Sequence, residues 1–293
     1  MDLRSRWLLF FFTLFTPLAL INAQTGAMEP ATILVASASG TVTVSDLQTG
    51  TFKPLQKGMK ITEGVTVQTG ENGSALLLFP NGSAVTIKKN TTLDIEEHKL
   101  SPIKEGTPNL KNLENEPSTS KTKLRLNQGD IIGTVKKLNV DKGSTFEIDS
   151  PIGTAGIRGT VWTMSVTISE NGEATGSFGI SVGNGFFIPL GGAEQYVGSE
   201  VVINVTIGRN ALGQPVITAI RSGQLPIRLF NEMTLDSEDV KKAFEALSGE
   251  EFEPEGEGEV GGNDNNRQRA KPNTIVAPVT PNQGEGSTTS GPQ

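Results

Sequence analysis

Residues 160–168 read TVWTMSVTI and form the clearest strand pattern in the chain. Large apolar side chains alternate there with smaller or polar ones, which is the two-residue period of a strand with one buried face. The side chains expected on that face are Trp162, Met164, Val166 and Ile168. Residues 170–173, ENGE, have the chemistry of a tight two-residue turn, after which the chain returns through residues 174–182. This stretch therefore predicts an antiparallel hairpin.

Similar short alternating runs, separated by Gly, Asn and Pro, continue on both sides of this hairpin between Gly40 and Phe230. Residues 80–83, PNGS, join two apolar runs as a second hairpin. Many short strands at this spacing are typical of a sandwich or jelly roll, and hairpins with one polar face favour antiparallel pairing. We expect an all-β, jelly-roll-like sandwich of mostly antiparallel strands.

Three segments depart from the strand pattern. Residues 96–121 are polar and contain three prolines, which predicts an inserted surface loop in a β domain of residues 24–235. Residues 236–249 have a helical period, with Asp236 as the expected cap, and predict one short amphipathic helix. Residues 250–293 hold eight acidic and three basic side chains and too few apolar ones for a core, so we expect a disordered acidic tail.

Composition excludes several classes of protein. The 293 residues include 25 Lys and Arg, 32 Asp and Glu, one His and no Cys, for a net charge of −7. Without cysteine there is no disulfide, thiolate nucleophile or Cys-based metal site, and one histidine excludes multi-histidine metal sites. The acidic balance argues against nucleic acid as a partner. We expect no metal and no cofactor.

The N-terminus has the pattern of a secretory signal peptide, residues 1–23. Arg4 and Arg6 precede a short apolar run, residues 7–21, which ends near the small residue Ala23. The run is shorter than the ~20 residues that span a bilayer. We expect cleavage before Gln24, export to the periplasm or the outside of the cell, and no stable transmembrane anchor afterwards.

Few residues offer catalytic chemistry. His98, the single histidine, lies in the predicted polar loop, where a solvated side chain is the expected outcome. Glu96 and Glu97 could act as the paired carboxylates of a glycosidase, but a polar strand end is the simpler interpretation. No phosphate-loop or dinucleotide fingerprint is present in the sequence. We therefore expect a protein that is not an enzyme, with no catalytic residues.

The most specific local feature is the stretch 149–162, DSPIGTAGIRGTVW. A proline and three glycines predict a close backbone turn from one strand into the next. Arg158, at its centre, either braces this turn through several backbone carbonyls or contacts a carboxylate or sugar acid of a ligand; we favour the brace. The residues of this feature, expected to be mainly structural, are Pro151, Gly153, Gly156, Arg158, Gly159, Thr160 and Trp162.

Residues 150–162 resemble the hallmark segment of FecR-type domains. Residues 79–87, FPNGSAVTI, with Thr92-Leu93 behind them, resemble the hairpin of that family. Residues 124–129, LRLNQG, and 146–148, FEI, resemble two of its strands, in the right order. The resemblance covers roughly Gly40 to Gly185 and implies a β-rich, jelly-roll-like domain outside the cytoplasm.

Familiar members of that family are transmembrane regulators that relay a signal from an outer-membrane receptor to a cytoplasmic sigma factor. Here only Met1–Arg6 precede the apolar run, so we expect a stand-alone, exported FecR-like domain. Three hypotheses follow. The first is a non-enzymatic binding or scaffold module for an envelope protein or surface polymer. The second is an extracytoplasmic component of a signal relay. The third is a carbohydrate-active jelly-roll enzyme, which would need a cleft with carboxylates and aromatic platforms such as Trp162 and Tyr196.

Overall fold

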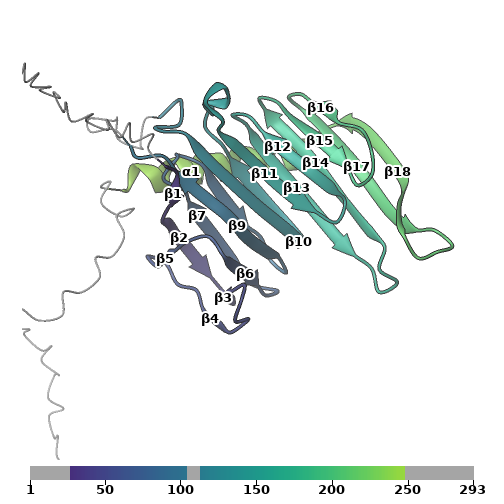
Figure 1. The fold of residues 1–293 in the computed structure, drawn as a ribbon, viewed down its shortest axis with the longest axis horizontal. Helices are drawn as coiled ribbons and strands as arrows, with labels where there is room; N and C mark the ends of the chain where they lie inside the picture. Colours follow the sequence, from purple (N-terminus) through teal and green to yellow (C-terminus); the bar gives the residue numbers. More distant parts are fainter. Residues whose placement is uncertain (1–26, 104–112, 248–293) are drawn as a thin grey trace, which may run out of the picture. The chain divides into compact units, whose positions relative to one another are not determined.

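The computed structural model describes residues 27–103 and 113–247. They form two β-sheets that pack face to face and one long helix on the outside of the second sheet (Figure 1). The strands of the first sheet, in spatial order, are β4 (Phe52–Pro54), β3 (Val42–Asp46), β6 (Val65–Thr69), β9 (Thr92–Leu100), β10 (Ser120–Thr134), β11 (Thr145–Ser150), β12 (Gly153–Ile157), β15 (Gly185–Pro189) and β16 (Gln195–Val197), with β1 (Glu29–Pro30) paired to the end of β9.

The second sheet has its own set of strands and shares one with the first. In spatial order they are β5 (Lys60–Ile61), β2 (Ile33–Ser39), β7 (Ser74–Leu78), β8 (Ala84–Ile87), β10, β13 (Val161–Ile168), β14 (Ala174–Val182), β17 (Val201–Arg209) and β18 (Pro215–Gln224). All pairings are antiparallel except β10 with β11. A short 3₁₀ helix, η2 (Val140–Lys142), lies between these two strands in the sequence. The predicted all-β sandwich is confirmed.

Strand β10 belongs to both sheets. Its first part pairs with β9 and β11, and its second part, from Gly129 onward, pairs with β8 and β13. Gly129 has φ +99°, and a Cβ atom there would lie 2.3 Å from Oγ1 of Thr91. Only glycine fits this corner without a clash, because the left-handed backbone and the close neighbour both exclude a side chain. The glycine of the LRLNQG motif therefore turns one strand from the first sheet into the second.

The space between the sheets is filled by one apolar core, to which almost every strand contributes. In β13 the predicted face is confirmed for Trp162, Met164 and Val166, which are buried. Ile168, at the end of the strand, is 42% exposed because the strand runs beyond the core there. Trp162 and Phe146 meet in the centre, with 6.1 Å between their ring centroids.

Helix α1 (Ile227–Glu245) covers the outer face of the second sheet. Val240 and Phe244 pack on β2 and β7, and Met233 packs near β10 and β17. The helix begins nine residues before the predicted start, Asp236. That residue is not the cap: it lies buried in the middle of the helix, 3.8 Å from Nζ of Lys88.

The predicted inserted loop also begins too early. Residues 96–100 are still part of β9, and β10 already begins at Ser120, so the connection is shorter than residues 96–121. The predicted signal peptide, residues 1–23, and the predicted tail, residues 250–293, lie outside the described residues. Among the residues that are described, no helix has both the length and the hydrophobicity needed to cross a membrane.

Candidate functional site

The hallmark segment carries the chain from one sheet to the other. Strand β11 ends at Ser150, Pro151 and Ile152 form a turn, and β12 begins at Gly153 in the first sheet. After β12, residues 158–160 cross to the second sheet, where β13 begins. Gly159 lies in this crossing with φ +76°, a conformation that suits glycine, and a Cβ atom there would lie 3.0 Å from Cα of Lys137. The predicted close turn is thus a crossing between sheets.

Backbone pairing fixes this crossing to the end of β10. Thr160 donates its N–H to the carbonyl of Val135 at 3.0 Å and accepts the N–H of Val135 at 2.8 Å. Trp162 follows with its indole ring over Gly133 of β10, where a Cβ atom would lie 2.2 Å from the ring. Trp162 is therefore a core residue, and it is not available as an aromatic platform for a sugar.

The remaining glycines of the hallmark allow close approach to β15. A Cβ atom on Gly153 would lie 2.3 Å from the carbonyl oxygen of Ile188. A Cβ atom on Gly156 would lie 2.0 Å from the ring of Phe186, its partner across the two strands. The Phe186 ring therefore lies directly over the backbone of the hallmark strand.

Arg158 is the exposed residue of this otherwise packed segment. Its guanidinium carbon lies 5.6 Å from the centroid of the Phe186 ring, a cation–π contact. The expected brace is not seen, because Arg158 donates no hydrogen bond to any residue in the described ranges. The ring holds the guanidinium in place while its N–H groups stay open to solvent.

A shallow pocket of about 560 Å³ opens beside Arg158, and we call it the hallmark pocket. Its cationic side chains are Lys136, Lys137 and Arg158, and its one carboxylate is Glu114. Its apolar and neutral lining residues are Leu113, Thr134, Val135, Gly159, Thr160, Val161, Val182 and Asn184. Burial lowers the pKa of Lys136, and the positive charge of Lys241 lowers it further. The pocket thus combines positive charge with an apolar floor.

His98 is not a solvated loop residue. It lies in β9, fully buried, with its Nδ1 atom 3.0 Å from Oγ1 of Thr122 and its ring edge-on to Phe79 at 4.9 Å. Burial lowers the pKa of His98 from 6.5 to about 3, so the ring is neutral at pH 7. His98 is thus a neutral, enclosed imidazole that packs as part of the core.

A β-bulge explains why His98 faces inward. Ile95 is paired with Leu124 but Glu97 with the adjacent Lys123, so Glu96 is the extra residue. The extra residue shifts the alternation by one position. Glu96 and Glu97 both face outward as a result, and His98 takes the inward position that strict alternation would assign to Glu97.

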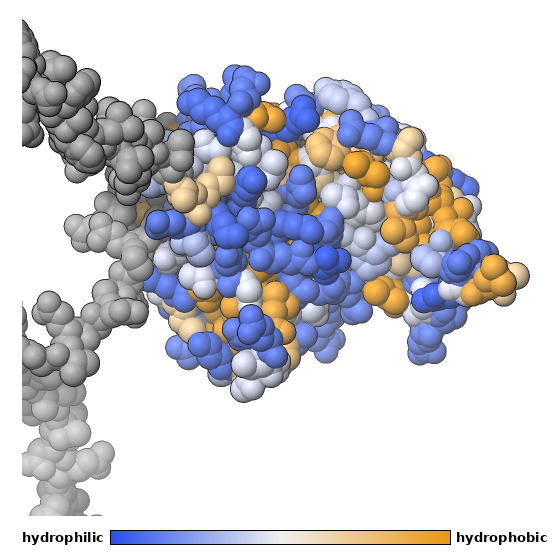
Figure 2. All heavy atoms as spheres, viewed as in Figure 1, coloured by the Kyte–Doolittle hydropathy of each residue, from blue (hydrophilic) through white to orange (hydrophobic). Residues whose placement is uncertain are grey.

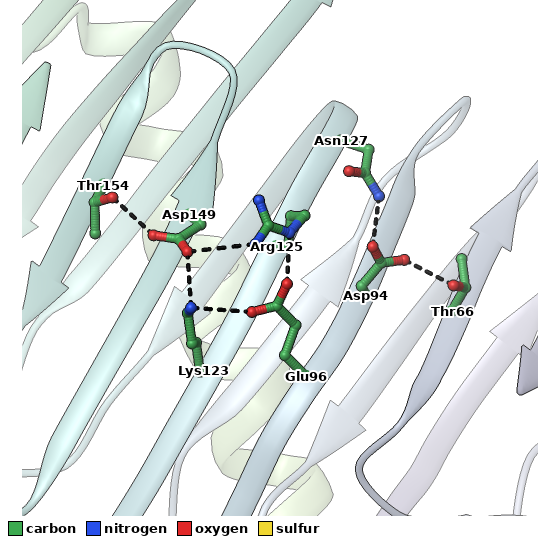
Figure 3. A network of polar contacts seen from close by, with 8 residues as sticks. All are labelled: Thr66, Asp94, Glu96, Lys123, Arg125, Asn127, Asp149 and Thr154. Carbon is green, nitrogen blue, oxygen red and sulfur yellow. Dashed lines mark hydrogen bonds and ion pairs between the residues drawn. The ribbon is translucent and has the colours of Figure 1, made fainter. Parts of the chain in front are cut away.

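The outer face of the first sheet carries a network of ion pairs (Figure 3). Glu96 accepts hydrogen bonds from Lys123 at 3.2 Å and Arg125 at 2.5 Å, and both cations also reach Asp149. Glu97 pairs with Lys99 at 3.2 Å. The two glutamates proposed as paired acids are thus each engaged by cations. Figure 2 shows hydrophilic residues gathered over the middle of this face.

Other clusters offer little chemistry. Asp94 accepts hydrogen bonds from Thr66 and Asn127, at 2.7 and 2.8 Å, and Asp149 accepts one from Thr154. In the ranges 27–103 and 113–247, no three carboxylate or imidazole side chains come together as metal ligands would. The polar side chains of this face form hydrogen bonds and ion pairs with one another across five neighbouring strands, β6, β9, β10, β11 and β12.

The two-sheet sandwich with its hallmark crossing defines an all-β domain. Residues 65–177 match the model of the family described as FecR protein. The chain therefore contains a FecR-type domain, as its motifs predicted. The matched region runs from β6 to the first part of β14 and includes the whole hallmark.

Two crystal structures of a proposed anti-sigma factor from Parabacteroides distasonis ATCC 8503 also resemble the chain. Both align with 12% sequence identity and a TM-score of 0.36, over 54% of this chain and 59% of the other. The aligned part is less than two thirds of that protein. No curated protein matches the sequence.

Proposed function

We propose that this protein is an exported FecR-type module that binds a macromolecule of the bacterial cell envelope without catalysing a reaction. The observation that carries the proposal is the hallmark crossing within the matched FecR region. Its glycines and Trp162 pack tightly inside the domain. Arg158, in contrast, contacts the Phe186 ring and is exposed to solvent. A rigid segment that presents one cation beside a pocket is suited to recognition.

A second candidate is a role in signal relay, as an extracytoplasmic component that acts together with a separate membrane protein. The FecR match favours it, because the family is regulatory. The carbohydrate-active alternative has less support: Glu96 and Glu97 are bound by lysine and arginine, and Trp162 is buried. We do not propose an enzyme.

The test begins with export. The full chain is expressed with a C-terminal tag in its host, and the exported protein is sequenced from its N-terminus. We expect a mature start at Gln24. Material that is found only in the cytoplasm, with Met1 intact, would overturn the exported part of the proposal.

Binding is tested with the same tagged protein. After reversible cross-linking in intact cells, envelope extracts are captured and the bound protein or polymer is identified. A saturable partner, displaced by excess untagged protein, is the expected result. Retention of an uncleaved N-terminus together with a membrane-protein partner would favour the relay over a free binding module. Capture of nothing above the untagged control would refute binding.

A further inference from the structure

The cations of the hallmark pocket differ in their surroundings from those on the outer face of the first sheet. On the outer face of the first sheet, Lys99, Lys123 and Arg125 each pair with two carboxylates within 4.0 Å. In the hallmark pocket, by contrast, Lys136, Lys137 and Arg158 form no ion pair with any residue that the structure describes. The cations that line the hallmark pocket are thus unpaired within the described residues, unlike the three on the outer face of the first sheet.

The pocket also has an apolar component. Val135 and Leu113 are buried beneath it, and Val182 is 59% exposed at its side. An exposed valine beside a buried valine and a buried leucine is a surface on which a small aliphatic side chain can lie. A ligand that fits this lining has an apolar group flanked by negative charges.

Lys136 gives a second reason to expect an anionic ligand in the pocket. Its stem is half-buried and packs over Gly82, and the positive charge of Lys241 acts on it together with burial to lower its pKa. Placing an ammonium in a desolvated position without a counter-ion is unfavourable. A carboxylate bound in the pocket would offset that cost.

We propose that the hallmark pocket binds an acidic peptide segment of a protein partner, with its carboxylates on Arg158 and Lys137 and an aliphatic side chain against Val135 and Val182. The planar guanidinium of Arg158, steadied by Phe186, suits a carboxylate, which it can bind through two parallel hydrogen bonds. The proposal rests on the proposed binding function and names its site and partner chemistry.

A long polyanion fits less well. Nucleic acid and charged glycans require an extended row of cations. Here the pocket holds three cations beside a carboxylate of its own, Glu114, and on the outer face of the first sheet Lys123 is paired with Glu96 and Asp149. An acidic peptide needs only the two or three charges that the pocket offers.

The test uses fluorescence anisotropy with the full mature chain. The probe is a fluorescein-labelled pentapeptide with two glutamates on each side of a central leucine. Lys137→Gln combined with Arg158→Gln removes two exposed cations from the pocket. The matched control, Lys53→Gln combined with Arg221→Gln, removes two exposed cations elsewhere, neither of which forms an ion pair within the described residues.

We expect the pocket variant to bind the probe at least tenfold more weakly, because it loses the charged hydrogen bonds of two cations to the carboxylates of the probe. The control variant should bind like the wild type, and all three proteins should unfold at the same temperature. Equal affinity in the pocket variant and the wild type would overturn the proposal.

Two further outcomes decide the chemistry of the ligand. A probe with glycine in place of leucine should bind more weakly; if it binds equally, the apolar floor has no role and the proposal fails. Inorganic phosphate is also added at a concentration equal to that of the probe. Displacement of the probe by phosphate would show a simple oxyanion site and would also overturn the proposal. Capture of the envelope partner by the pocket variant would refute this site and leave the proposed function intact.

Discussion

His98 gives the sharpest prediction, because its buried neutral ring links the stability of the fold to pH. In the folded protein burial lowers the pKa of His98 from 6.5 to about 3. Below pH 6.5 the unfolded chain takes up a proton that the folded chain does not, so the free energy of unfolding falls with falling pH. The loss of unfolding free energy caused by His98 reaches its full size near pH 3, and above pH 6.5 His98 causes no loss.

The magnitude follows from the size of the shift. One pH unit corresponds to about 1.4 kcal/mol, so the loss attributable to His98 is about 2 kcal/mol at pH 5 and approaches about 5 kcal/mol at pH 3. The assay is urea unfolding at pH 7, 6 and 5. The control is His98→Gln, whose amide can still reach Thr122 but does not titrate in this range.

We expect the wild type to lose about 2 kcal/mol more than His98→Gln between pH 7 and pH 5. Carboxylates such as Asp236, whose pKa is raised by burial, act equally in both proteins and cancel in the difference. The chain has one histidine, so its imidazole proton resonance can be followed directly by NMR. A folded-state titration near pH 6.5, or equal slopes in the two proteins, would refute the reasoning.

Three further substitutions, two of them with matched controls, test the packing and the ion-pair network. Gly133→Ala should cost about 1–3 kcal/mol in urea unfolding, because its new methyl group would lie 2.2 Å from a buried indole ring, whereas Gly223→Ala, with nothing within 4 Å, should be close to neutral. Phe244→Ala should lower the free energy of unfolding by about 3 kcal/mol, against under about 0.5 kcal/mol for exposed Leu235→Ala. Glu96→Gln should cost only about 0.5–1 kcal/mol, since its cationic partners are partly exposed, and this cost should shrink in 1 M salt.

The sequence predicted the architecture well because its strongest signals are local. Alternation in residues 160–168 identified β13, and the PNGS turn identified the β7–β8 hairpin. The glycines of the hallmark predicted a tight turn, which the structure places between the sheets. These features depend on neighbours within a few residues, which is the range at which period and turn chemistry carry information.

What the sequence did not predict depends on distant partners or on a shift of period. The bulge at Glu96 reverses the facing of every residue after it in β9, and nothing in IEEHKL marks which glutamate is the extra one. The start of α1 was missed because buried, charged Asp236 interrupts its apolar stripe, although Pro226 just before the helix is a signal that was available. Phe186, the partner of Arg158, lies 28 residues farther along the chain, and local periodicity and turn signals carry no information about a contact at that separation.

The shared strand β10 also bears on how this chain can change its length over evolution. Strands outside the FecR match, such as β2 and β17, lie toward the two ends of the second sheet, so residues gained or lost in their loops alter the sandwich only locally. One residue inserted in the first part of β10 would shift the residues beyond it against their partners in β9 and β11, and would displace Gly129 from the corner between the sheets. Insertions and deletions near the ends of the second sheet are thus tolerated, whereas the number of residues in β10, from Ser120 to Thr134, is constrained.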